Sequence, residues 1–222
     1  MKPSDLVLWT LAGALAYLLG SLPFGFLIAR CRGVDIRTVG SGNIGATNVY
    51  RAVSKPLGIL TFALDVGKGV GGVLLIPMAA SLLLTALLPT GSPAPTRALQ
   101  LFSGCVTVIG HNWTCFLGFK GGKGVATSAG LLIGLSPAGV GIAFAVWLVT
   151  FLTTRYVSVA SIAAAAVLGV VVWPLHCGDA GAWFPAVLTA LAALAIWKHR
   201  ANIIRLRAGT ESRFTFKKKA SA

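Results

Sequence analysis

The feature that most constrains this chain is a series of long segments without a charged side chain. The first, Leu6–Ala29, has 24 residues. A helix of that length spans about 36 Å at about 1.5 Å per residue, enough to cross a hydrocarbon core of about 30 Å. Of the 222 residues, 56% are hydrophobic and 11% are charged, a composition that excludes a protein with an ordinary water-facing surface. The sequence therefore predicts an all-α integral membrane protein.

Flanking charges orient the first segment. Arg30, Arg32 and Arg37 follow it, whereas a cleavable secretory signal carries its cations before a shorter apolar region. The segment is therefore predicted to remain as one continuous helix. Because the end that bears Lys or Arg normally stays in the cytoplasm, the N-terminus is predicted to lie outside.

Apolar segments recur along the rest of the chain. The 31 residues 124–154 carry no charge and contain Ser136–Pro137, which predicts two crossings hinged at that pair. With the hinge, seven transmembrane helices are predicted, and Arg155 and the C-terminus both lie on the cytoplasmic side, as the positive-inside rule prefers. The six later helices are predicted at 57–88, Ala98–Phe119, Gly124–Leu135, 137–154, Tyr156–Leu175 and Ala182–Trp197.

The charge balance agrees with this topology. The chain has 19 Lys and Arg against 5 Asp and Glu, a formal net charge of +14. Most of the cations lie between helices on the predicted cytoplasmic side or in the tail, so a nucleic-acid ligand is unnecessary. No internal repeat is present, and we predict one polytopic membrane domain over residues 1–222, with 213–222 as a flexible basic tail and a monomer favoured.

Neither a metal nor a cofactor is expected. The carboxylates available on the cytoplasmic side are Asp35, Asp65 and Glu211, and they form no close pair of the kind that binds a hard cation. No cysteine spacing is typical of a zinc site. Free thiols are predicted for the four cysteines, which are Cys31, Cys105, Cys115 and Cys177.

Three polar segments between the helices carry the candidate site. The first lies between Gly33 and Lys55 and has the sequence GSGNIGATN over 40–48. It matches the dinucleotide fingerprint G-x-G-x-x-G, and Asp65 follows Gly45 by 20 residues. That fingerprint requires a strand, a turn and a helix in a parallel sheet. Because Asp65 lies in an apolar membrane segment, a dinucleotide site is rejected, and a flexible turn remains the alternative for this loop alone.

The second polar segment is Lys120-Gly-Gly-Lys123-Gly124, directly before a short apolar helix. Glycines let backbone amides close around an anion, and a helix N-terminus and two lysines add positive charge. The predicted helix spans only about 18 Å, so its start is expected to lie within the membrane. A phosphate site and an anchor for anionic lipid headgroups both fit this segment alone, and the P-loop spacing is absent.

The third cluster follows the last apolar segment. His199, Asn202 and Arg205 recur every three residues on a predicted continuing helix, and Glu211 follows. A solvated basic tail is the alternative interpretation, and it applies to the terminal lysines. The predicted topology brings all three segments to the cytoplasmic rim, where hydroxyls, amides, cations and an imidazole would form an anion site.

Two charged residues lie inside an apolar segment. Asp65 and Lys68 are three residues apart, which permits an ion pair within one helix, and unpaired charges there would be costly. We predict that this pair and His111-Asn112 support the loops rather than react. His176 is predicted to lie in an outer loop with a structural role.

Together, the three polar segments resemble one family, the bacterial membrane acyltransferases that move a fatty acyl group from acyl phosphate to glycerol 3-phosphate. The family's signatures are matched by residues 40–48, 110–127 and 199–211, so the resemblance covers nearly the whole chain. The chain departs from the family pattern at Ile44, where proline is expected, and at Trp113-Thr114, where Phe-Pro is expected. The resemblance implies seven helices, a cytoplasmic active site in the bacterial inner membrane, and 1-acyl-glycerol 3-phosphate as the product of the first step of phospholipid synthesis.

The resemblance also implies roles for individual residues. The expected catalytic residues are Ser41, Lys120, His199 and Asn202. These four and Arg51 are expected around glycerol 3-phosphate, and the amides of the second loop around acyl phosphate. The expected substrate-binding residues are Gly42, Asn43, Gly45, Thr47, Asn48, Arg51, Gly121, Gly122, Lys123, Gly124, Thr127, Arg205 and Glu211.

Direct transfer is the predicted mechanism, because acyl phosphate is a mixed anhydride with a good leaving group. The general base is predicted to be either His199 or a phosphate oxygen of the substrate. A transporter of phosphate or of a phosphorylated metabolite is the alternative function, but it would normally have broken helices in repeated halves. A structural lipid-binding protein would explain the basic inner surface and would leave uncharged donors such as Ser41 and Asn202 unexplained.

Overall fold

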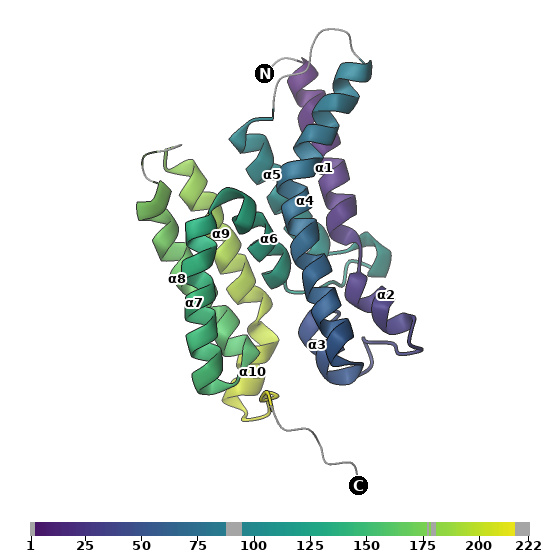
Figure 1. Ribbon diagram of the computed structural model, residues 1–222, viewed down its shortest axis with the longest axis vertical. Helices are drawn as coiled ribbons and strands as arrows, with labels where there is room; N and C mark the ends of the chain where they lie inside the picture. The colour runs from purple at the N-terminus through teal and green to yellow at the C-terminus, as the bar shows by residue number, and fades with distance from the viewer. Residues whose placement is uncertain (1–2, 88–94, 177, 179–180, 216–222) are drawn as a thin grey trace. The chain divides into compact units, whose positions relative to one another are not determined.

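The computed structural model describes residues 3–87, 95–176, 178 and 181–215. It divides into two compact units, Met1–Pro137 (unit 1) and Ala138–Ala222 (unit 2). The described residues form helices joined by loops, and none of them lies in a strand (Figure 1). The helices of unit 1 are α1 (Pro3–Ser21), α2 (Phe24–Arg30), α3 (Ala46–Ala52), α4 (Lys55–Leu87), α5 (Arg97–Asn112), the 3-10 helix η1 (Cys115–Leu117) and α6 (Val125–Leu135). Those of unit 2 are α7 (Pro137–Thr154), α8 (Val157–His176), α9 (Trp183–Lys198) and α10 (Arg200–Arg207).

The core at one end of unit 1 is shared by α1, α4 and α5. Leu8 and Ala12 of α1 pack against Ala80 and Leu84 of α4 and against Leu99 of α5. The start of α1 therefore meets the end of α4 and the start of α5. It follows that α1 and α5 run in the same direction and that α4 runs opposite to both (Figure 1).

Glycines bring α4 and α6 into backbone contact. A methyl group added at Gly69 would overlap the backbone of α6, and one added at Gly130 would overlap the backbone of α4. One turn further along both helices, Gly134 lies against Val73, so the two helices are parallel. Small residues at such spacing permit the close approach by which membrane helices associate. This contact fixes the position of α6 against α4, and with it the point where the lysine loop joins α6.

The first predicted span, Leu6–Ala29, lies within Pro3–Arg30, a segment long and apolar enough to cross a membrane, but it is not one continuous helix. The helix breaks at Leu22–Pro23 because proline has no amide hydrogen and restricts the residue before it. The Lys68 ammonium donates to the carbonyl oxygens of Gly20 and Leu22, both at 3.0 Å. A charge from α4 thus satisfies carbonyl groups that the end of α1 leaves without helical partners.

The helix predicted over Ala98–Phe119 also ends early, because α5 stops before Trp113 and η1 follows. The Thr114 hydroxyl donates to the Ser21 carbonyl at 2.6 Å, and the Tyr17 hydroxyl donates to the Trp113 carbonyl at 2.7 Å. These bonds join residues 93 and 96 positions apart and attach the turn after α5 to the end of α1. Threonine therefore has a hydrogen-bonding role at the position where the resemblance leads us to expect proline.

The predicted break at Ser136–Pro137 is confirmed. α6 ends at Leu135 and α7 begins at Pro137, a first-turn position where proline is favoured because the amide there has no helical partner. With 11 residues, α6 is a short helix, as predicted. Gly124, directly before it, has φ +78°, a left-handed conformation that favours glycine.

In unit 2, α8 and α9 run antiparallel. The Thr189 hydroxyl donates to the Gly169 carbonyl at 2.9 Å and accepts from the Trp173 indole at 3.1 Å. His176 packs edge-on against Phe184, with ring centroids 4.9 Å apart. The prediction that His176 lies in an outer loop is wrong, because it is the last residue of α8 and is buried.

The helices agree with a membrane protein. Four segments of the described residues are long and apolar enough to cross a membrane, and they are Pro3–Arg30, Lys55–Leu87, Pro137–Thr154 and Val157–His176. α6 and α9 are shorter apolar helices. The all-α prediction is therefore confirmed.

Two predictions about single side chains are also tested. The Asp65–Lys68 ion pair is confirmed, with 3.0 Å between Oδ1 and Nζ. Cys31, Cys105 and Cys115 are free thiols, as predicted. Cys177 and the tail lysines 217–219 lie outside the described residues.

Candidate active site

The first polar loop is organised around the buried side chain of Asn48. Its Oδ1 accepts from the Ser41 amide at 3.0 Å, and its Nδ2 donates to the carbonyl oxygens of Ile36, Val39 and Asn43 at 3.1, 3.0 and 2.9 Å. The Asn48 side chain thus holds the loop in place. The reason is that four groups of the loop itself use its hydrogen-bonding capacity.

The other residues expected to bind substrate in this loop lie at its surface or on α3. Ser41 is exposed, and Gly40 and Gly42 have φ +59° and +67°. The Asn43 Oδ1 accepts from the Gly45 amide at 2.8 Å, a turn that leads into α3. Thr47 is half-buried on α3 and Arg51 is exposed on its last turn.

A salt bridge fixes the start of the loop. The Arg37 guanidinium donates to both carboxylate oxygens of Asp35, at 2.9 and 2.7 Å, and lies over the Phe26 ring at 4.8 Å. The hydrogen bond from the Arg37 side chain lowers the pKa of Asp35 to about 2. Asp35 is therefore an anion that is paired with its own cation.

The second loop folds back onto the end of α5. A methyl group added at Gly121 would overlap the His111 carbonyl, and one added at Gly122 would overlap the His111 ring. The Gly122 amide donates to the His111 carbonyl at 3.0 Å. The loop therefore closes by using this amide internally.

The residues around these glycines face different surroundings. Lys120 is exposed and Lys123 is half-buried. Gly124 lies with its Cα against the Asn112 side chain. Thr127 is fully buried on the first turn of α6, and its hydroxyl has no hydrogen-bond partner among the described residues.

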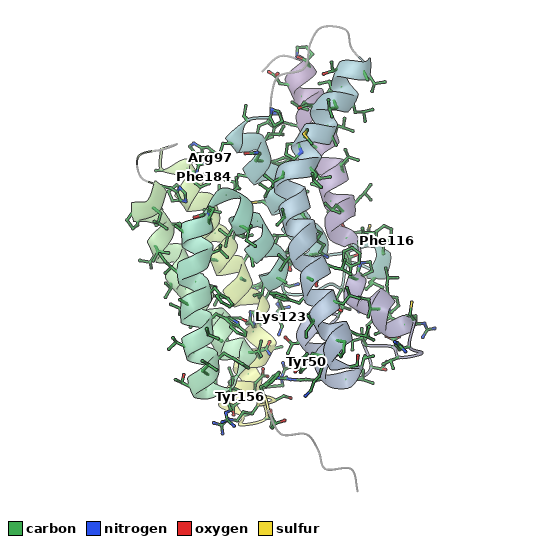
Figure 2. The ribbon with its side chains drawn as sticks, in the orientation of Figure 1. Tyr50, Arg97, Phe116, Lys123, Tyr156 and Phe184 are labelled. Carbon is green, nitrogen blue, oxygen red and sulfur yellow. The ribbon has the colours of Figure 1, made fainter. Side chains whose placement is uncertain are left out.

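The first two loops belong to the same end of unit 1. Ile44 and Val49 of the first loop form a buried cluster with Ala29 and Ile36, and Leu117 of η1, three residues before Lys120, packs against it. Figure 2 shows Lys123 at the start of α6, toward the end of unit 1 opposite Arg97. Ile44 thus contributes to this core at the position where the family pattern has proline.

In unit 2, Glu211 organises the third cluster. Its Oε1 accepts from the Asn202 amide and from the Ser158 hydroxyl, both at 2.7 Å, and its Oε2 accepts from Arg205 Nε at 2.8 Å. Asn202 and Arg205 lie on α10, as their spacing predicts, whereas His199 lies at the junction of α9 and α10 rather than within one continuing helix. Glu211 therefore orients Asn202, and its carboxylate is satisfied within the cluster.

His199 has a defined ring orientation. Its Nδ1 lies 2.8 Å from the carbonyl oxygen of Ala195. A carbonyl oxygen only accepts, so the neutral ring carries its proton on Nδ1 and its lone pair on Nε2. This is the tautomer that a general base acting through Nε2 requires.

The hydrogen bonds to Glu211 also predict how stability depends on pH. Burial alone would raise the pKa of Glu211, but the hydrogen bonds from Asn202, Ser158 and Arg205 outweigh it and hold the pKa below the usual 4.5. A lowered pKa means that the stabilisation is complete above pH 4.5 and is lost as the pH falls further. Glu211→Gln is expected to lose about 2 kcal/mol at pH 7, with a smaller further loss on acidification than the wild type. Thermal unfolding between pH 7 and pH 3.5 checks this, and an unchanged acid dependence in the variant would contradict it.

Sequence reasoning missed three side chains of these clusters. Ser158 lies in an apolar segment, and nothing in its neighbours indicates that it donates to Glu211. Tyr17 and Thr114 act through contacts between distant parts of the chain. The sequence signal for Thr114 is its departure from the family pattern.

Comparisons with known proteins agree with the three motifs. The glycerol-3-phosphate acyltransferase family pattern matches residues 10–209. Among relatives of that name, the protein of Geobacter metallireducens is 48% identical over 204 residues, covering 92% of this chain and 95% of the relative. The protein of Desulforudis audaxviator is 44% identical over 207 residues, covering 92% and 94%.

Solved structures give the same result. The crystal structure of PlsY (YgiH), an integral membrane glycerol 3-phosphate acyltransferase, in its glycerol 3-phosphate form, has a TM-score of 0.77 and 40% sequence identity. The similarity covers 93% of this chain and 96% of that one. The lysophosphatidic acid form of PlsY has a TM-score of 0.74 and 39% identity.

Proposed function

The chain belongs to the glycerol-3-phosphate acyltransferase family, and we propose that it transfers a fatty acyl group from acyl phosphate to the 1-hydroxyl of glycerol 3-phosphate. The products are 1-acyl-glycerol 3-phosphate and phosphate, in the first step of phospholipid synthesis. The observation that carries this proposal is that one family match, residues 10–209, includes the first two polar motifs and His199, Asn202 and Arg205 of the third. None of the comparisons supports the transporter alternative.

The proposal includes the topology. Seven helices cross the membrane or enter it, with the N-terminus outside, the C-terminus cytoplasmic and the active site on the cytoplasmic side of the inner membrane. The positive-inside rule supports this orientation, because Arg30, Arg32 and the lysine loop lie toward one end of unit 1. The proposal also includes a monomeric protein.

The resemblance assigns glycerol 3-phosphate binding to Ser41, Arg51 and Lys120, which are exposed, and to His199 and Asn202. The fixed orientation of Asn202 by Glu211 supports this assignment, because a preorganised amide loses little freedom on binding.

Acyl phosphate binds to the lysine loop and the start of α6. In this proposal the phosphate group is bound by the half-buried Lys123, the buried Thr127 hydroxyl and the Gly121 amide. The positive end of the α6 dipole adds to the attraction. Asn43 and Thr47 complete this set, and Asn48 and the Gly122 amide hold the loops instead. The acyl chain lies in lipid or between helices.

Transfer proceeds in one displacement. The 1-hydroxyl oxygen of glycerol 3-phosphate attacks the acyl carbonyl carbon, and the bond from that carbon to the phosphate oxygen breaks. The hydroxyl proton passes to His199 Nε2 or to a phosphate oxygen, and inorganic phosphate leaves. Each well-placed donor to the developing negative charge contributes roughly 3 kcal/mol.

Direct transfer predicts that no acyl-enzyme accumulates. Purified protein is mixed with palmitoyl phosphate without the acceptor, quenched within milliseconds and analysed by intact-protein mass spectrometry. The expected spectrum contains only unmodified protein, because acyl phosphate has a good leaving group and its direct transfer needs no covalent intermediate. A palmitoyl adduct that maps to Ser41 and disappears on addition of glycerol 3-phosphate would establish a covalent mechanism instead.

A further inference from the structure

Three buried titratable side chains inside unit 1 are connected through Asp65, which contacts both Lys68 and His111. Asp65 Oδ1 lies 3.0 Å from Lys68 Nζ and 3.5 Å from His111 Nδ1. The Asp65, Lys68 and His111 side chains are 4%, 1% and 6% exposed. Lys68 in turn donates to carbonyl oxygens at the end of α1. The three residues therefore connect α1, α4 and α5 inside the unit.

Among these three residues, His111 contacts the lysine loop. The His111 carbonyl accepts from the Gly122 amide at 3.0 Å. The His111 ring occupies the place where a Gly122 side chain would lie, with Nε2 nearest, and the His111 carbonyl occupies the corresponding place at Gly121. Both glycines thus have room only for hydrogen atoms against His111.

The carboxylate of Asp65 fixes which edge of the ring faces the loop. A carboxylate accepts only, so the ring proton on its side is on Nδ1, and the Nε2 edge is directed toward Gly122. Asp65 itself is held by Lys68, which also donates to the Gly20 carbonyl at the end of α1 and to the Leu22 carbonyl directly after it. Rotation of the His111 ring would therefore have two effects at once: it would break the contact with Asp65, and it would displace the lysine loop.

We propose that Asp65 and His111 are positioning residues for acyl transfer. They touch no substrate, and they act through Gly121 and Gly122 by fixing the loop that carries Lys120 and Lys123. This inference rests on the proposed function of the lysine loop. A displacement of about 1 Å in a reacting group costs on the order of 100-fold in rate, which sets the size of the expected effect.

The test is a double-mutant cycle of His111→Asn and Gly122→Ala. Asparagine places an amide nitrogen near the position of Nδ1, so Asp65 keeps a donor, but it lacks the ring edge at Gly122. His111→Asn is expected to lower kcat/KM about 100-fold, while its unfolding temperature stays within about 3 °C of the wild type. A residue with a purely structural role would lower both together.

Gly122→Ala is expected to lower both activity and unfolding temperature in the wild-type background, because the methyl group overlaps the ring. In the His111→Asn background, the same methyl group has room and is expected to cause less than about a 3-fold further loss. Asp5→Asn, the same chemical change as Asp65→Asn but in the first turn of α1, is the matched control and is expected to retain full activity. Asp65→Asn is expected to lose about 100-fold.

Two outcomes would overturn the proposal. One is wild-type kcat/KM in His111→Asn, and the other is independent effects of the two substitutions across the cycle. Failure of the proposed function gives a different result, in which wild-type protein releases no phosphate from palmitoyl phosphate and glycerol 3-phosphate. Even then, the unfolding temperatures of the four proteins show whether His111 and Gly122 are coupled.

Discussion

Replacing Lys120 with alanine is expected to lower kcat/KM by about 100- to 1,000-fold, the effect of losing one well-placed donor to a developing negative charge. Lys120 follows η1 and is exposed at the edge of a loop whose glycines are fixed against His111. Its position is therefore determined by the fold, although its ammonium group is open to a ligand. The assay follows phosphate release from palmitoyl phosphate and glycerol 3-phosphate by purified protein in detergent or lipidic mesophase.

The matched control is Lys55→Ala, which removes an exposed lysine from the first turn of α4 in the same unit and is expected to leave release within about 3-fold of the wild type. Lys120→Arg keeps the charge and is expected to recover part of the activity. If Lys120 only anchors the protein to anionic headgroups, the loss will appear in anionic lipid and vanish in neutral detergent. That result would restore the lipid-anchor interpretation of the loop.

Replacing Gly69 with alanine is expected to destabilise the protein by about 3 kcal/mol, the upper range for overpacking, and to lower the unfolding temperature by roughly 6–12 °C. The added methyl group would overlap the carbonyl oxygen of Thr127. Because backbone atoms of α6 have no alternative rotamer, the two helices must separate. Activity is expected to fall as well, since α6 begins at the lysine loop.

Gly67 offers an internal control two residues away on the same helix. A methyl group at Gly67 meets no atom within 4 Å, and alanine is favoured over glycine inside a helix by about 1 kcal/mol. Gly67→Ala is therefore expected to be neutral or to raise the unfolding temperature, the opposite sign to Gly69→Ala. Equal effects of the two substitutions would show that α4 and α6 do not meet through Gly69.

Features set by local chemistry could be predicted from the sequence. Proline fixed the break before α7, and three-residue spacing identified the Asp65–Lys68 pair. Proline also broke the helix at Leu22–Pro23, where the uninterrupted apolar pattern argued for continuity. The hydropathy of a segment indicates whether it lies in the membrane. It does not indicate whether the backbone carbonyl groups of that segment accept hydrogen bonds from another helix.

The candidate site was predictable as a set of residues and less so as a set of roles. Glycine and lysine at the start of α6 indicate an anion site by their chemistry alone. By contrast, Asn48 and Asn202 are both amides in polar motifs, yet one holds its own loop and the other is oriented by Glu211. That difference depends on contacts with other parts of the chain, such as Ser158, which no local pattern encodes.

The Lys68 contact at the end of α1 has a consequence for how the protein enters the membrane. Alone, α1 and α2 bring into lipid a broken helix whose carbonyl groups lack helical partners, and α4 alone brings an ammonium that is paired only with Asp65. Each is unfavourable in hydrocarbon by itself, and the contact between them lowers the cost of both. We therefore expect insertion of the first helix to be stabilised once Lys68 has been synthesised, which would couple the early steps of biogenesis to one side chain.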